Sequence, residues 1–139
     1  MFTNNTFGKT VDIMQRTMDV SLTRREVIAN NIANAETPNF KRTDVNFEAS
    51  LARALASENA PKNLEAKMSS SRHIPFNRQV DYKSVQPRFV LDYLTQTKNN
   101  GNNVDIEQET MASTQNQMMY ELMTTSMSSQ FSRINMVLR

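Results

Sequence analysis

The chain has 139 residues, enough for one domain, and its 16 basic and 14 acidic residues leave a formal net charge of +2. The basic residues are scattered, with no run of three, so the sequence lacks the clustered charge that nucleic-acid binding requires. The absence of cysteine excludes disulfides and thiolate metal sites.

The N-terminal segment, residues 1–14, has no charged lead followed by an apolar block and a small-residue cleavage site. We therefore expect no cleaved secretory signal. No apolar run approaches the ~18–20 residues that a membrane helix needs, so we expect no membrane insertion.

Apolar residues at intervals of three and four predict a long amphipathic first helix. Thr6 or Thr10 would cap its start, and Pro38 disfavours helical geometry at the residue before it, so the helix is expected to end between 34 and 36. Because such a helix is stable only when its apolar stripe is buried, it needs a partner. The stripe consists of Val11, Met14, Met18, Leu22, Ile28 or Ala29, and Ile32.

The end of this helix is rich in asparagine, at Asn30, Asn31 and Asn34, although asparagine is a mediocre helix former. One interpretation is that these side chains cap a fraying last turn. The other is that they hydrogen-bond to a helix of a neighbouring subunit and fix its register. The sequence leaves both open.

The middle of the chain, residues 37–103, is predicted to form an irregular, partly extended arm with little β structure. A short helix is expected over 47–56, capped by Asp44 or Asn46. Residues 88–94 fit either a strand or a short helical turn, and 98–103 form a turn before the last helix.

The sequence offers few candidates for a catalytic site. His73 is the only histidine, and no cysteine or acidic pair lies near it in the sequence. The acidic group at 105, 107 and 109 lacks the spacing and turn glycine of a calcium loop. We therefore predict no catalytic, metal or cofactor site, and no enzyme.

From Ile106 to the C-terminus there is neither proline nor glycine, which predicts a long final helix. Asp105 is expected to cap it, the acidic residues at 107 and 109 suit its positive end, and Arg133 and Arg139 suit its negative end. Its heptad-like seam comprises Tyr120, Met123, Met127, Phe131, Ile134 and Leu138. Pairing with the first helix predicts a mainly α fold, with a coiled-coil-like terminal domain of residues 1–36 plus 104–139.

The last helix is also apolar away from that seam, at Met111, Met118, Met119 and Leu122. One partner helix cannot cover both faces, and the rest of the chain has too little apolar sequence to cover the second. This surplus indicates a second interface and hence assembly.

The segment from Asn31 to Lys41, NIANAETPNFK, resembles the N-terminal signature of the bacterial flagellar rod and hook axial proteins, roughly N-x-A-N-x-x-T-P-G-[FY]-[KR]. Asn39 stands where that pattern has glycine, and asparagine tolerates the positive φ expected there. Residues 71–75, 101–107 and 120–131 narrow the resemblance to the subunit of the proximal rod.

The resemblance implies a structural subunit in the periplasmic rod of the flagellar basal body, which assembles into a hollow drive-shaft. It implies export by the flagellar type III apparatus without a cleaved signal, with Phe2 and Phe7 as candidate export contacts. Implied partners are the chain itself, the rod subunits FlgC, FlgF and FlgG, the adaptor FliE, and the export gate with the MS-ring.

Two other readings remain: a soluble helical-hairpin adaptor or secretion chaperone of a type III export system, and the sibling rod subunit FlgC. We expect the motif turn at Thr37, Pro38, Asn39 and Phe40. The assembly interface is expected to comprise the two apolar stripes and the asparagines: Val11, Met14, Met18, Leu22, Asn30, Asn31, Ile32, Asn34, Tyr120, Met123, Met127, Phe131, Ile134 and Leu138.

Overall fold

A computed structural model describes residues 6–58, 69–70, 72–73, 79–95 and 99–138. The chain is mainly helical, as predicted, and none of the described helices has the length and hydropathy needed to cross a membrane. The expectations for Phe2, Arg139 and most of the segment 71–75 fall outside the described residues. The elements are α1 (Thr6–Ala33), β1 (Thr43–Asn46), α2 (Glu48–Glu58), a 3-10 turn η1 (Tyr82–Ser84), β2 (Arg88–Leu91) and α3 (Ile106–Val137).

The chain forms two compact units, one of residues 1–45 with 89–139 and one of residues 46–88. The first unit therefore contains more than the two terminal helices. Residues 37–45 and 89–103, which the sequence analysis placed in the arm, group with those helices.

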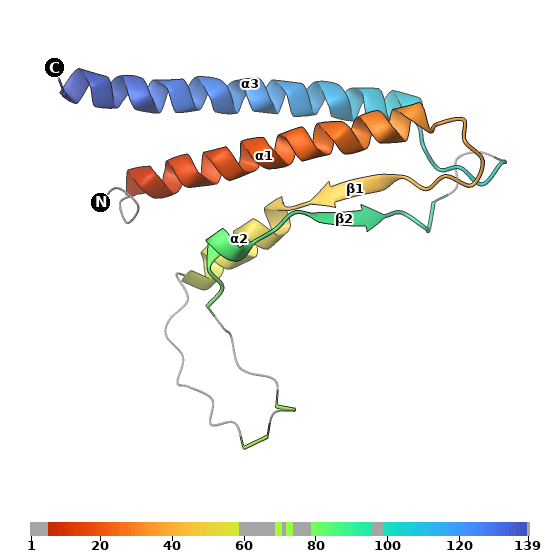
Figure 1. The fold of residues 1–139 in the computed structure, drawn as a ribbon, viewed down its shortest axis with the longest axis horizontal. Helices are drawn as coiled ribbons and strands as arrows, with labels where there is room; N and C mark the ends of the chain where they lie inside the picture. The colour runs from red at the N-terminus through yellow and green to blue at the C-terminus, as the bar shows by residue number, and fades with distance from the viewer. Residues whose placement is uncertain (1–5, 59–68, 71, 74–78, 96–98, 139) are drawn as a thin grey trace. The chain divides into compact units, whose positions relative to one another are not determined.

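In the first unit α1 and α3 lie side by side and run in opposite directions (Figure 1). The rings of Phe7 and Phe131 meet edge to face, with centroids 6.4 Å apart, where the start of α1 lies beside the end of α3. Asp105 caps α3 as expected, since its Oδ1 accepts hydrogen bonds from the main-chain N–H groups of Glu107 and Gln108. The predicted pairing of the terminal helices is confirmed.

The buried face of α1 differs from the predicted stripe. Its buried residues are Val20, Ser21, Ile28 and Asn31, whereas Leu22 is 46% exposed and Ile32 is 37% exposed. The reason is that α1 contacts two elements: Arg24 Nη2 donates to Val45 O of β1 at 3.2 Å, and Asn116 Nδ2 of α3 donates to Ser21 O at 2.9 Å. The residues of α1 that face β1 and α3 are therefore buried, and part of the predicted apolar stripe stays exposed.

On α3 the predicted seam is half-buried at Tyr120, Met123, Met127 and Ile134, but Phe131 and Leu138 are exposed. Glu109 and Asn116 are the buried residues of this helix. Polar side chains thus occupy part of the interface that periodicity assigned to apolar ones.

Strands β1 and β2 form an antiparallel two-stranded sheet (Figure 1), which decides the open choice for residues 88–94 in favour of a strand over Arg88–Leu91. In the second unit, the predicted short helix is confirmed as α2. Asp44, one of its two expected caps, instead accepts a hydrogen bond from the N–H of Val45. Among the described residues of this unit, the buried apolar ones are Phe47, Leu51, Ala54 and Tyr82.

Candidate assembly site

The chain leaves α1 through the motif turn, and the loop 99–103 lies against that turn. Asn102 is fully buried, and its Nδ2 donates to the carbonyl oxygens of Asn34 at 2.9 Å and Thr37 at 2.8 Å. Its Oδ1 accepts from the N–H of Val104 at 2.7 Å. These two carbonyls already accept from the main-chain N–H groups of Thr37 and Phe40, so Asn102 adds a second hydrogen bond to each and ties the loop to the exit turn of α1.

The backbones of turn and loop approach closely at two left-handed residues. Asn39 has a φ of 60°, as expected for a residue at the glycine position of the motif, and Gly101 has a φ of 81°. A Cβ on Gly101 would lie 2.6 Å from Asn39 Oδ1. Lys41 Nζ donates to Gly101 O at 2.8 Å and closes the contact.

Gly101→Ala is expected to lower the free energy of unfolding by about 1–2 kcal/mol, because a side chain at positive φ is strained and Asn39 must also move. Urea unfolding followed by circular dichroism measures this. Asn99→Ala, in the same loop at a residue without positive φ, is the control. Equal midpoints for the two variants would refute the close approach.

Asn103 occupies a place in the sheet itself. Asp92 N donates to Arg42 O at 2.9 Å. In place of a bond from Arg42 N to Asp92 O, the side-chain amide of Asn103 bonds to both of these atoms. Its Oδ1 accepts from Arg42 N at 2.6 Å, and its Nδ2 donates to Asp92 O at 2.7 Å and to Thr95 Oγ1 at 3.1 Å. The loop before α3 is thereby fixed between the ends of both strands.

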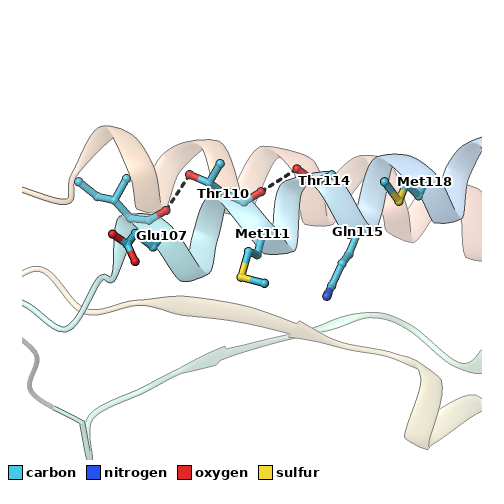
Figure 2. A pocket seen from close by; sticks show the side chains of 7 residues that line it. Glu107, Thr110, Met111, Thr114, Gln115 and Met118 are labelled. Carbon is cyan, nitrogen blue, oxygen red and sulfur yellow. Dashed lines mark hydrogen bonds between the residues drawn. The ribbon is translucent and has the colours of Figure 1, made fainter.

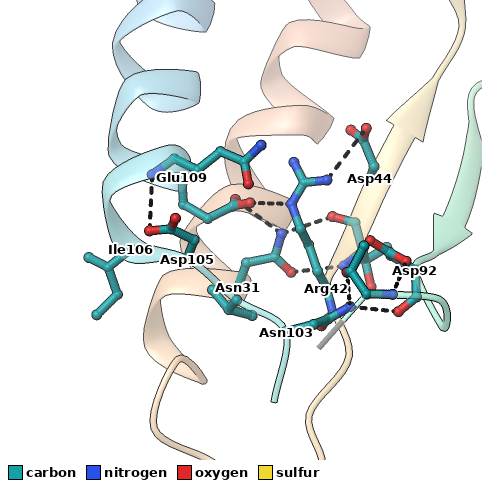
Figure 3. Close-up of polar contacts among 12 residues, drawn as sticks. Asn31, Arg42, Asp44, Asp92, Asn103, Asp105, Ile106 and Glu109 are labelled. Atoms are coloured by element: carbon teal, nitrogen blue, oxygen red, sulfur yellow. Dashed lines mark hydrogen bonds and ion pairs between the residues drawn. The ribbon is translucent and has the colours of Figure 1, made fainter. Parts of the chain in front are cut away.

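A buried charge joins α3 to α1 and to the start of β1 (Figure 3). Glu109 is fully buried, with Oε1 accepting from Arg42 Nε at 2.5 Å and Oε2 accepting from Asn31 Nδ2 at 3.1 Å. Asn31 Nδ2 also donates to Thr43 O at 2.8 Å, and its Oδ1 accepts from Thr43 N at 3.1 Å. We call this set, Asn31, Arg42, Asn102, Asn103 and Glu109, the polar clasp.

Two charged groups at the clasp, Arg42 and the neighbouring Asp92, have shifted pKa values. Burial by itself would lower the pKa of Arg42, but the hydrogen bond and charge of Glu109, with the charges of Asp44 and Asp92, raise it above its ordinary value. The pKa of Asp92 is lowered below its ordinary value, chiefly by the hydrogen bond from the Thr95 hydroxyl. Burial opposes this shift, whereas the N–H groups of Leu94 and Thr95 and the charge of Arg42 add to it. Because the pKa of Asp92 is lower in the folded chain, its carboxylate stabilises the fold at pH values above the unfolded pKa of ~3.9. That contribution is lost as the pH falls through the folded pKa.

The described acidic side chains near the clasp take part in capping and ion pairing within the subunit. The acidic residues at the start of α3 do not converge: Asp105 caps the helix, Glu107 is exposed, and Glu109 is paired with Arg42. In the described part of the chain no three acidic or histidine side chains are placed to hold a metal ion. His73 is exposed, and its main-chain N–H donates to Ser70 O.

The asparagines at the end of α1 and just after it make their hydrogen bonds within the subunit. Asn31 was expected at the assembly interface, but the structure places it inside the subunit, where both ends of its amide are bonded. Asn34 Nδ2 donates to Asn30 O at 2.9 Å and Asn30 Oδ1 at 3.0 Å, and its Oδ1 accepts from Thr37 Oγ1. Asn34 therefore caps the last turn locally.

Sequence reasoning missed most of the clasp. Glu109 was interpreted through the helix dipole, and residues 98–103 were described as a turn only. The available signal was the concentration of asparagines around Gly101, since buried asparagines supply paired donors and acceptors to irregular backbone. Nothing in the sequence linked them to Asn31 or Arg42.

The remaining residues of the predicted assembly interface are exposed or half-buried. Val11, Met14 and Met18 are half-buried, and in the motif turn Phe40 is half-buried while Thr37, Pro38 and Asn39 are exposed. The outer face of α3 exposes Met111 by 66%, Met118 by 63%, Met119 by 52% and Leu122 by 66%. A hollow on this helix (Figure 2) is lined by Ile106, Glu107, Thr110, Met111, Thr114, Gln115 and Met118.

Comparison with known proteins gives a consistent result. The family described as "Flagella basal body rod protein" matches residues 15–41, which cover most of α1 and the motif turn. The chain is 44% identical over 135 residues to flagellar basal body rod protein FlgB of Borreliella burgdorferi, covering 97% of this chain and 99% of that protein. It is 43% identical to FlgB of Borrelia hermsii with the same coverage, and 30% identical to FlgB of Bacillus subtilis over 95% of each chain.

Proposed function

Because this chain belongs to the FlgB family of flagellar basal body rod proteins, we propose that it is a self-assembling subunit of the proximal rod. In this proposal its terminal helices pack with those of neighbouring copies and of other rod subunits to form a hollow drive-shaft in the periplasm. The observation that supports it best is the exposed apolar face of α3, which α1 leaves uncovered.

That face has the chemistry of a protein interface. Met111, Met118 and Leu122 repeat at intervals of seven and four residues, so they share one side of the helix. A group of exposed apolar side chains on one side of a helix marks an interaction site. At ~25 cal/mol per Å² each contact is modest, and repetition along a polymer supplies the strength.

The polar clasp has a supporting role in this function. A rod needs identical geometry in every copy, and the clasp fixes how the chain leaves α1 and enters α3. It does so with hydrogen bonds from side chains of four different segments, among them the fully buried Glu109, which bonds to Asn31 and Arg42. The half-buried and exposed residues of the predicted interface remain free to meet neighbours.

Within this proposal, export proceeds through the flagellar type III apparatus without a cleaved signal. The proposed neighbours are FlgC, FlgF and FlgG along the rod, with FliE, the export gate and the MS-ring at its base. A soluble export chaperone of the same helical-hairpin shape would keep a discrete size when purified. A rod subunit instead gains helix content as it polymerises.

Met118→Glu is expected to abolish motility, because it places a charge in the proposed interface without touching the clasp. The test replaces the flgB gene of a motile bacterium by the gene for this chain, and measures swimming and basal bodies by electron microscopy. Ser128→Glu is the control, since Ser128 is exposed and lies about 80° around the helix from Met118. Normal rods with Met118→Glu, at normal periplasmic levels, would contradict the proposed interface.

A further inference from the structure

The two edges of the β1–β2 sheet differ in their hydrogen bonding. At the outer edge of β1, Thr43 N and O are bonded to the Asn31 side chain, and Val45 O accepts from Arg24 Nη2. Val45 N donates to Asp44 Oδ1 at 2.7 Å. Side chains therefore close this edge, and no further strand can add to β1.

The outer edge of β2 is open. The bond from Asp92 N to Arg42 O fixes the antiparallel register, and alternation along the ladder then turns the main-chain groups of Val90 toward β1 and those of Phe89 and Leu91 away from it. The described part of the chain offers these outward groups no hydrogen-bond partner.

The side chains on this strand are apolar and exposed. Phe89 is 62% exposed, Val90 49% and Leu91 47%, and Tyr93 and Leu94, just beyond the strand, are 70% and 98% exposed. An apolar strand with free backbone groups is a template for adding another strand.

We propose that β2 docks against β2 of a second copy of this chain, antiparallel and centred on Val90. In this register Phe89 lies opposite Leu91 of the second copy, and these are the residues whose backbone groups point outward. Two such pairs give four main-chain hydrogen bonds.

The charges at the ends of the strand fit the same register. Arg88, which is exposed, lies opposite Asp92 of the second copy, and the reverse pair forms at the other end. Pro87, which has no N–H to donate, falls just outside the paired segment. An apolar centre flanked by two opposite-charge pairs makes the strand complementary to itself.

The pairing closes at two copies, because it has two-fold symmetry and the β1 edge is blocked. Subunits of a rod all point in one direction, so this dimer is a state of the free subunit that separates before incorporation. It covers an edge that would otherwise promote aggregation. This inference does not depend on the rod interface proposed for α3.

Cysteine crosslinking tests the register, since the chain has no cysteine of its own. Residue 90 would face its own copy in a non-hydrogen-bonded pair, with Cα atoms ~4.5 Å apart, within disulfide range. Under mild oxidation of the purified chain, Val90→Cys is expected to form disulfide-linked dimers about tenfold faster than Leu94→Cys, and urea should remove the difference. Equal rates without urea would overturn the proposal.

A charge variant adds a second arm. Arg88→Glu in the Val90→Cys background is expected to slow crosslinking, because residue 88 faces Asp92 of the second copy. Arg53→Glu, at an exposed residue outside the paired segment, makes the same charge change and should leave the rate unchanged. If Val90→Cys instead links to a different protein in cells and remains monomeric when pure, the second copy is not the occupant and the proposal fails.

Discussion

Glu109→Gln is expected to lower the free energy of unfolding by about 3 kcal/mol, the low end for breaking a buried ion pair. The carboxylate is fully buried, while the Arg42 side chain keeps 21% of its exposure, so water offsets part of the loss at the arginine. The variant removes the charge that Arg42 faces and leaves a neutral amide beside the amide of Asn31. Urea unfolding monitored by circular dichroism gives the value.

The matched control for this prediction is Glu107→Gln, two residues earlier on the same helix. Glu107 is exposed, and only its main-chain N–H takes part in the cap. We expect its effect to stay within about 0.5 kcal/mol. Similar losses in both variants would mean that Glu109 contributes through the helix dipole alone and that the clasp does not hold the subunit together.

Asn31→Leu is expected to cost about 2–4 kcal/mol, although leucine has a similar size and a higher helix propensity. The substitution leaves Thr43 N and O without the partners that tie β1 to α1, and it takes one donor from Glu109. Thermal or urea unfolding of the purified chain measures the loss.

Asn30→Leu provides the comparison, because Asn30 precedes Asn31 in the same helix but is exposed. Its side chain accepts only the local bond from Asn34, so we expect a change below about 0.5 kcal/mol. If instead Asn31→Leu leaves the isolated subunit stable and only rods fail to form, the intersubunit interpretation of Asn31 is right and the clasp interpretation is wrong.

Combining the two changes measures their interaction. Asn31 and Glu109 share a hydrogen bond, so the double variant Asn31→Leu with Glu109→Gln should cost less than the sum of the single losses. The Met118→Glu variant acts on a different surface and should leave unfolding unchanged. Stability and assembly can therefore be separated by residue.

The sequence by itself determined the features that depend on residues close together in the chain. The spacing of apolar residues predicted α1, the absence of proline and glycine after Ile106 predicted α3, and Asp105 predicted its start. Pro38 placed the end of α1 at 34–36, and the helix ends one residue earlier, at Ala33. The motif around Asn39 predicted a positive φ and the family. Each depends on backbone preferences within a few residues, which a sequence displays directly.

Tertiary structure alone decided which residues fill the interior. Glu109 and Asn31 are 78 positions apart, and Asn102 lies 68 positions from the helix end that it caps, so no periodicity connects them. The presence of β1 beside α1 moved the buried strip from Leu22 and Ile32 to Ser21 and Asn31. A buried polar group is tolerated only where partners converge on it, and convergence is set by the fold rather than by local sequence.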